Sequence, residues 1–295
     1  MPGPAALQHR AEQLAASLPP LLVAAERVAA TVAQGVHGRR RVGQGETFWQ
    51  FRQYSPGDPV PRIDWRESAK SQHLYVRETE WEAAQSVWLW RDSSPSMDYA
   101  STAALPSKRQ RTDILLLALA ALLVRGGERV TLLGSGVPPA SGRAVLNRLG
   151  LTLERQGSGP ELPQFQPLPR HGQLVWIGDL LAPLETIHAL VGRFASGGLR
   201  GHLLQVLDPA EETLPFMGRV RFEGFEAEDP LLISRVETVR DDYQARLAKH
   251  REGLAAIARA TGWSFGTHRT DRPPHTALLA LYGALAEPRR RPGRR

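Results

Sequence analysis

The sequence predicts an α/β protein built on a doubly wound, mostly parallel sheet, and three observations lead to this fold class. From Ser86 onward, short apolar segments typical of strands alternate with longer helical segments, which is the pattern of a parallel sheet covered by helices. The chain has 295 residues, of which 42% are hydrophobic and 23% charged, so it can bury a full-sized core. It contains no cysteine, which excludes disulfide-stapled folds, thiolate catalysis and cysteine-based metal sites.

The region before this alternation divides into two parts. Residues 1–34 are predicted to form a helical lead-in, because apolar side chains recur at helical spacing on both sides of a Pro-Pro pair. Residues 35–85 are predicted to form a small β-rich element. In it, strands over residues 48–54 and 73–78 flank a turn rich in proline and glycine.

The predicted α/β domain covers residues 86–286, and residues 287–295 are predicted to be a solvated, Arg-rich tail. The longest apolar run, Ile114 to Val124, is well short of the roughly 20 residues that cross a bilayer, so it is predicted to be a buried helix. The predicted strands cover residues 87–90, 129–133, 174–177, 202–206 and 219–222. The predicted helices cover residues 108–125, 143–155, 184–195, 237–261 and 276–285.

The formal net charge of +7 does not by itself indicate a nucleic-acid partner. Eight arginines lie in two short runs, at residues 39–41 and 289–295, and without them the remaining charges nearly cancel. No extended basic face is therefore expected, and we predict no nucleic-acid binding. The N-terminus has no basic stretch followed by an apolar core, so no secretory signal is predicted and a cytoplasmic location is expected.

A cluster of oxygen-bearing side chains follows the first predicted strand of the α/β domain. Asp92, Ser94 and Ser96 are spaced by single residues directly after that strand, and Asp179 follows the strand at residues 174–177. Ligands of open α/β sheets bind at the carboxyl ends of strands, so these side chains are expected to converge. One carboxylate and two hydroxyls suit Mg²⁺, which prefers hard oxygen ligands and keeps some water. The alternative is that these residues only turn the chain and cap the next helix.

The sequence shows no signature of common catalytic machinery. None of the nine histidines has metal-binding spacing, and neither a nucleophile elbow nor a phosphate-binding loop is present. We therefore expect that the protein is not an enzyme. The alternative is a metal-dependent hydrolase or phosphatase that uses Asp92 as nucleophile or Mg²⁺ ligand. For this reading the sequence offers neither a positioned lysine nor a clear acid–base partner.

Two parts of the sequence resemble known families. The Asp-x-Ser-x-Ser pattern of Asp92, Ser94 and Ser96 resembles the start of the metal-ion-dependent adhesion site of von Willebrand factor A-like domains. Residues 52–70, with parts of residues 76–80, resemble the signature of the domain-of-unknown-function-58 (DUF58) family, in which this stretch precedes such a domain. The resemblance implies a von Willebrand A-like, Rossmann-like sheet for the α/β domain.

The resemblance also implies roles for single residues. Asp92, Ser94 and Ser96 correspond to the first-loop ligands of Mg²⁺ (or Mn²⁺), and Asp179 corresponds to a third-loop acidic residue that usually acts through water. The usual second-loop threonine has no clear counterpart, and Ser158 is the loop hydroxyl that remains as a candidate. A site of this kind implies a module that binds a carboxylate of another protein through the metal. If the site is degenerate, a metal-free scaffold is implied instead.

Partners are implied by the resemblance as well. Proteins similar to this one are commonly encoded beside MoxR-type AAA+ ATPases and are thought to help them assemble or remodel other proteins. The implied protein is therefore a bacterial, cytoplasmic interaction module with two protein partners, the ATPase and its client. Within the family signature, we expect Arg62, Asp64 and Trp65 to fix the β-rich element onto the main sheet by buried ion pairs and aromatic packing.

Overall fold

The computed structural model divides the chain into two compact units, each described here by itself. The main unit contains the helix that precedes residue 39 and the chain after residue 84, and the smaller unit contains residues 39–84. The tail predicted at residues 287–295 lies outside the described residues. The described residues are 20–36, 47–55, 63–80, 84–225 and 229–286.

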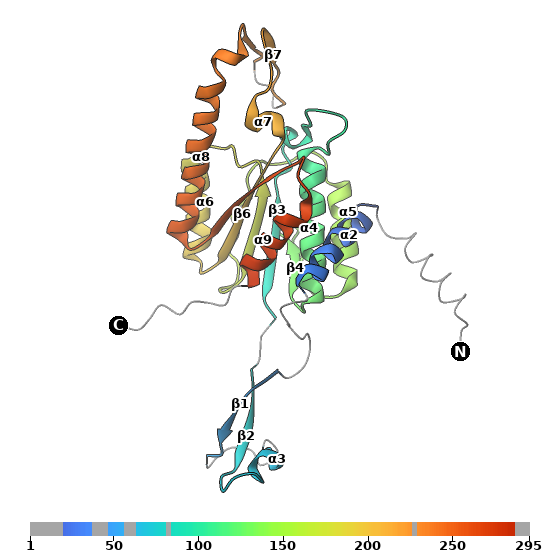
Figure 1. The fold of residues 1–295 in the computed structure, drawn as a ribbon, viewed down its shortest axis with the longest axis vertical. Coiled ribbons are helices and arrows are strands. Elements are labelled where there is room, and N and C mark those ends of the chain that lie inside the picture. Colours follow the sequence, from blue (N-terminus) through green and yellow to red (C-terminus); the bar gives the residue numbers. More distant parts are fainter. Residues whose placement is uncertain (1–19, 37–46, 56–62, 81–83, 226–228, 287–295) are drawn as a thin grey trace, which may run out of the picture. The chain divides into compact units, whose positions relative to one another are not determined.

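A five-stranded parallel sheet forms the middle of the main unit (Figure 1). Its strands are β3 (Ser86–Arg91), β4 (Arg129–Leu132), β5 (Gln173–Gly178), β6 (Arg200–Leu207) and β9 (Ser264–Arg269). The strand order is β4-β3-β5-β6-β9, so β3 lies between β4 and β5. Parallel pairing places Val87 of β3 opposite Val130 of β4 and Gln173 of β5.

The edge strand β9 is the strand of this sheet that the sequence analysis did not predict. Its sequence, Ser-Phe-Gly-Thr-His-Arg, contains a single apolar side chain, and most of its residues are partly exposed. The strands β3 and β5 are instead buried along nearly their whole length, which produces the continuous apolar runs by which they are recognised. Backbone pairing with β6, from His202 opposite Ser264 to Leu207 opposite Arg269, holds β9 at the edge.

Helices cover both faces of the sheet, which confirms the doubly wound prediction (Figure 1). The helices are α2 (Pro20–Val36), α4 (Lys108–Arg125), α5 (Arg143–Arg155), α6 (Leu184–Ser196), α7 (Pro209–Thr213), α8 (Arg240–Thr261) and α9 (Pro274–Ala286). Val87 and Leu89 of β3 pack with α2, α4, α5 and α9 on one face, and Trp88 and Trp90 pack with α6 and α8 on the other. Side chains alternate between the faces of a strand, so one apolar run contributes to both layers.

The helix α4 is the buried helix that the apolar run predicts, and its residues from Leu115 to Leu123 are all buried. A capping box begins it: the Ser107 hydroxyl accepts from the Gln110 backbone N–H at 3.2 Å, and the Gln110 side chain accepts from the Ser107 N–H at 3.1 Å. From the predicted lead-in, α2 packs against α4 and buries Ala25 and Ala29. Across the described part of the chain, none of the helices combines the length and apolarity that spanning a membrane requires.

The smaller unit contains an antiparallel pair, β1 (Thr47–Gln53) and β2 (Tyr75–Glu80), and the short helix α3 (Trp65–Ser68). The expectation that Arg62, Asp64 and Trp65 fix this element onto the main sheet stays a prediction. The Asp64 carboxylate caps α3 by accepting two backbone hydrogen bonds at 3.1 and 3.0 Å, and Trp65 is 61% exposed. Arg62 lies outside the described residues.

The strand predicted at residues 219–222 exists, but it does not belong to the main sheet. It forms β7 (Val220–Phe222), which pairs antiparallel with β8 (Leu231–Ile233) in a separate two-stranded sheet. The segment is only three residues long and none of them is fully buried. It therefore lacks the long apolar run that marks the central strands of this fold.

Packing between β6 and Trp263 gives a test of the fold. A Cβ atom at Gly201 would lie 2.1 Å from Cε3 of Trp263, whose indole N–H donates to the Leu199 carbonyl at 3.3 Å. Gly201→Ala must displace this buried ring, so we expect it to lower the free energy of unfolding by about 1–3 kcal/mol. The control is Gly283→Ala in α9, where no atom lies within 4 Å of the new Cβ, and it should stabilise by less than about 1 kcal/mol. Urea unfolding measures both variants, and wild-type stability of Gly201→Ala would contradict this packing.

Candidate functional site

The carboxyl ends of β3 and β5 bring two acidic residues to one edge of the sheet. Asp92 follows β3 and Asp179 follows β5, and the two strands pair in parallel with Arg91 opposite Ile177. The backbone N–H of Asp92 donates to the Ile177 carbonyl at 2.8 Å, which extends the pairing by one residue. A Cβ atom at Gly178 would lie 2.8 Å from the Asp92 Cβ, so only glycine permits this approach. Strand pairing therefore fixes where both carboxylates lie.

Four of the five residues predicted to form the site are connected by a chain of close oxygen–oxygen contacts. Asp92 Oδ1 accepts from the backbone N–H of Ser94 at 2.8 Å and from its hydroxyl at 2.6 Å. The Ser94 and Ser96 hydroxyl oxygens lie 3.0 Å apart, and Ser96 Oγ donates to Asp179 Oδ2 at 2.9 Å. Asp92, Ser94 and Asp179 are buried and Ser96 is half-buried, so this chain of oxygens reaches solvent at Ser96.

The hydrogen bonds of this loop test the alternative that these residues only turn the chain and cap the next helix. The bond from the Ser94 N–H to Asp92 is an Asx-type turn, so Asp92 does stabilise the local backbone. Ser94 occupies the N-cap of the short 3₁₀ helix Pro95–Asp98, but its side chain makes no capping hydrogen bond. The hydroxyls of Ser94 and Ser96 instead lie between the carboxylates of Asp92 and Asp179 and contact them. A turn accounts for Asp92 but not for both hydroxyls.

Burial and the surrounding charges determine the electrostatics of the Asp92 carboxylate, and these charges include Arg91 and Arg109 as well as Asp179. Burial raises the pKa of Asp92 to about 7 and the negative charge of Asp179 adds to this, while the hydrogen bonds from Ser94 oppose the rise. In the described structure Asp92 forms no salt bridge. The raised pKa shows that this position favours a cation or a proton on Asp92.

A buried lysine that sequence reasoning did not place in the site lies beside Asp179. Lys108, the first residue of α4, has a side chain only 1% exposed, and its Nζ lies 3.0 Å from Asp179 Oδ2 and 2.6 Å from Glu211 Oε1. Burial lowers the pKa of Lys108, but Asp179 and Glu211 outweigh burial and raise it, so the ammonium is charged. The sequence analysis did not predict this lysine at the Asp179 end of the site, and its ammonium pairs with Asp179 and Glu211, not with Asp92. One signal was present in the sequence: Lys108 is one of only three lysines beside 34 arginines.

The turn after Asp179 is held on two sides. Leu180 has a φ of 53°, which is unusual for a residue other than glycine, and it is buried. The Gln205 side chain of β6 donates to the Asp179 carbonyl at 2.8 Å, and the His250 ring of α8 lies 2.7 Å from the Leu180 carbonyl. The neighbouring strand and helix thus fix the direction in which the Asp179 side chain leaves the sheet.

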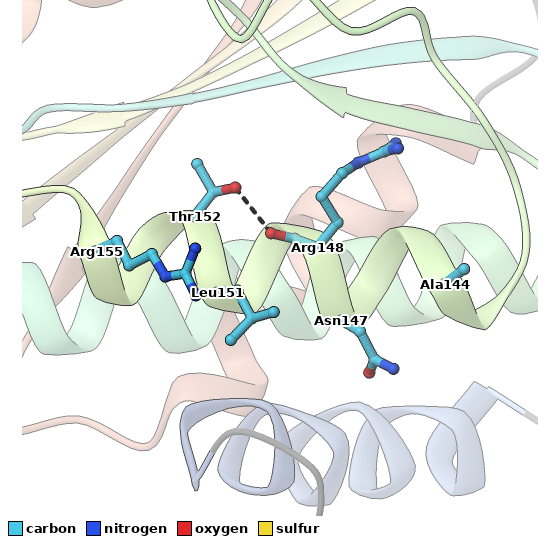
Figure 2. A pocket seen from close by; sticks show the side chains of 6 residues that line it. All are labelled: Ala144, Asn147, Arg148, Leu151, Thr152 and Arg155. Atoms are coloured by element: carbon cyan, nitrogen blue, oxygen red, sulfur yellow. Dashed lines mark hydrogen bonds between the residues drawn. The ribbon is translucent and has the colours of Figure 1, made fainter.

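The second-loop hydroxyl predicted at Ser158 does not join this cluster. Its loop lies at the site, because the Gly159 N–H donates to the Ser93 carbonyl at 2.8 Å, but Ser158 is exposed. Thr152, the threonine nearest to it in sequence, donates to the Arg148 carbonyl within α5 at 2.8 Å and lines a pocket formed by α5 side chains (Figure 2). That pocket is lined by Ala144, Asn147, Arg148, Leu151, Thr152 and Arg155.

The donor set decides which metal the site fits. No three His, Cys, Asp or Glu side chains in the described ranges are grouped so that they could hold a metal ion on their own. An ion at this edge would depend on the Asp92 carboxylate, the Ser94 and Ser96 hydroxyls and water, while one oxygen of Asp179 is already paired with Lys108. Hard oxygens with few carboxylates fit Mg²⁺ or Mn²⁺, and the lack of nitrogen or sulfur ligands does not fit Zn²⁺.

Comparison with known proteins identifies the family. The profile of the family described as "Protein of unknown function DUF58" matches residues 50–253, which is more than half of the chain. The chain belongs to the DUF58 family. Uncharacterized proteins of Mycobacterium tuberculosis and Mycobacterium bovis are 28% identical to it over 276 residues, covering 88% of this chain and 86% of each relative. The DUF58 resemblance seen in the signature at residues 52–70 is therefore confirmed.

Two solved structures from Bacteroides are similar in outline. One is a conserved hypothetical protein, BatB, of Bacteroides thetaiotaomicron, with 14% identity and a TM-score of 0.42. It covers 69% of this chain, which in turn covers 98% of it. The other is an aerotolerance-related membrane protein of Bacteroides fragilis with 16% identity and a TM-score of 0.40, covering 68% of this chain and 98% of its own length.

The pKa of Asp92 predicts how stability depends on pH. The folded protein binds the Asp92 proton up to about pH 7, whereas the ordinary pKa is 3.8, so the unfolded chain releases it earlier. The contribution of Asp92 to the free energy of unfolding is fully present below its ordinary pKa and is lost as the pH rises through about 7. Asp92→Asn resembles the protonated form. In EDTA, the free energy of unfolding of Asp92→Asn relative to wild type should therefore rise by a few kcal/mol from pH 4 to pH 8. The expected size is on the order of 1.4 kcal/mol for each pH unit by which the folded-state pKa of Asp92 exceeds its ordinary value.

Urea unfolding at several pH values measures this difference. Ser158→Ala, which alters an exposed hydroxyl of the neighbouring loop, is the matched control and should follow the wild-type curve at every pH. A difference between Asp92→Asn and wild type that stays constant across this range would contradict the assignment.

Proposed function

We propose that this DUF58 protein is a protein-interaction module that binds Mg²⁺ or Mn²⁺ at Asp92, Ser94 and Ser96 and, through the metal, a carboxylate of a partner protein. The observation that supports this most is the chain of hydroxyl and carboxylate oxygens from Asp92 to Asp179, which runs from the buried strand ends to half-buried Ser96. A site at the carboxyl ends of central parallel strands is where open α/β sheets bind ligands.

Each loop residue has a distinct part in this proposal. Asp92 supplies the carboxylate that lacks an ion pair, Ser94 and Ser96 supply neutral hydroxyl oxygens, and Asp179 is held in place by Lys108. The metal, when bound, supplies a coordination position for an anionic oxygen. A divalent charge that only Asp92 neutralises leaves net positive charge at the protein surface. Metal and partner carboxylate should therefore strengthen each other's binding.

The partner that we propose is a MoxR-type AAA+ ATPase, with which the module would act on a client protein. This part of the proposal depends on the family resemblance. We further propose that the protein has no catalytic activity of its own and works in the cytoplasm. The role of the module would be to hold the client or the ATPase by a surface carboxylate, in a manner that divalent ions control.

Binding between the purified protein and a purified MoxR-type ATPase from the same organism tests the proposal. Isothermal calorimetry in Mg²⁺ should show binding at least about tenfold tighter than in EDTA, because the ion offsets repulsion between two carboxylates. Asp92→Ala should remove the effect of Mg²⁺, whereas Ser158→Ala, in the adjacent loop, should keep it. Equal affinity of the wild-type protein with and without divalent ions would reduce Asp92, Ser94 and Ser96 to a structural turn.

A metal-dependent hydrolase is a second candidate, because a buried lysine, Lys108, lies beside Asp179 at the same edge of the sheet. Its weakness is geometric: Lys108 Nζ is buried between two carboxylates, and the residue two positions after Asp92 is Ser94, a hydroxyl in place of an acid. A generic phosphate ester with Mg²⁺ separates the two candidates. We expect no turnover above the background of Asp92→Asn, and turnover that this substitution abolishes would favour the hydrolase.

A further inference from the structure

Lys108 is a buried cation whose backbone and side chain are both held by hydrogen bonds. Its backbone N–H donates to the Tyr99 carbonyl at 3.1 Å, and it follows directly on Ser107, the capping residue of α4. Its side chain is 1% exposed, so the ammonium depends on protein groups for its hydrogen bonds. A buried charge with fixed partners cannot turn away when a second cation approaches.

One carboxylate oxygen connects Lys108 to the proposed metal ligands. Asp179 Oδ2 accepts from Lys108 Nζ at 3.0 Å and from Ser96 Oγ at 2.9 Å. The ammonium is therefore separated from a proposed ligand hydroxyl by a single shared oxygen. Any cation bound by Ser96 and Asp179 would therefore be repelled by the positive charge of Lys108.

Glu211 fixes the ammonium from the other side. Its Oε1 lies 2.6 Å from Lys108 Nζ, and its Oε2 accepts from the Asp208 N–H at 2.8 Å within the capping box that begins α7. The Tyr243 hydroxyl of α8 donates to the Glu211 carbonyl at 2.5 Å. Because Glu211 is itself held by two elements, it keeps Lys108 directed at Asp179.

We infer that Lys108 is a positioning residue that limits the affinity of the site for divalent cations by occupying Asp179 Oδ2. This inference rests on the proposed metal function and specifies how that site is regulated. With the ammonium in place, Asp179 contributes little negative charge to a bound ion, so the ion stays weakly held and keeps charge for a partner carboxylate. Without the ammonium, Asp179 would become a full second carboxylate for the metal.

Mn²⁺ binding measured by electron paramagnetic resonance tests this on the full-length protein. Lys108→Met keeps a long side chain but removes the charge, and we expect it to bind Mn²⁺ about tenfold or more tightly than wild type. The double variant Lys108→Met/Glu211→Gln removes both charges of this ion pair, so it leaves no unpaired carboxylate at Glu211. It replaces the single variant in the measurement if the single variant does not fold. Adding Asp179→Asn to either variant should abolish the gain, because the effect of Lys108 is transmitted by Asp179.

The outcomes separate the two claims. A merely structural role for Lys108 predicts weaker or unchanged Mn²⁺ binding in the folded variants, and that result overturns the inference while leaving the metal site intact. Binding by the Lys108 variants but not by wild type supports the inference and contradicts the proposed metal function of the natural protein. No Mn²⁺ binding by any variant overturns both. Glu211→Gln alone removes a negative charge but retains the Lys108 ammonium, so it is the control and should bind Mn²⁺ no more tightly than wild type.

Discussion

The parallel pairing of β3 with β5 is the constraint on which the rest of this protein depends. It places the ends of two buried strands side by side, so that Asp92 and Asp179 leave the sheet at the same edge. Both strands are buried because helices cover both faces of the sheet. A one-residue change in this pairing would direct one of the two carboxylates to the opposite face and dissolve the cluster.

The pairing also creates the electrostatic problem that defines the site. Two buried carboxylates at one edge repel each other, and the protein compensates only one of them with a buried cation. Asp179 receives Lys108, while Asp92 keeps a raised pKa and is bridged to its neighbour only by the neutral hydroxyls of Ser94 and Ser96. This asymmetry distinguishes the site from a simple turn, because a turn would not require a buried ammonium beside it.

Much of the fold and part of the site could be predicted from the sequence. Long apolar runs identify β3, β5 and α4. These elements are buried on nearly all sides, so most of their side chains are apolar. The Asp-x-Ser-x-Ser spacing identifies the β3 loop because its residues are adjacent in the chain. Elements that depend on a pattern within one continuous segment can therefore be predicted correctly from the sequence.

The remaining features depend on contacts between distant parts of the chain. The pair of Lys108 with Asp179 spans 71 positions, and the strand β9 is defined by its pairing with β6 because its own composition gives no signal. Exposed Trp65 shows the reverse case, since a large aromatic residue in a β-rich segment favours burial but here follows the residue that caps α3. For Ser158 the sequence identifies a loop that contacts the site through the Gly159 backbone, while the Ser158 residue itself is exposed.

A crystal structure of the protein with Mn²⁺ and the proposed partner, a MoxR-type ATPase, would test the central claim most directly. The account predicts an anomalous difference peak in contact with Asp92 and with the hydroxyls of Ser94 and Ser96, with a carboxylate oxygen of the partner on the same ion and Lys108 still on Asp179. A well-ordered complex without a peak at this edge, or with the partner bound elsewhere on the chain, would contradict it.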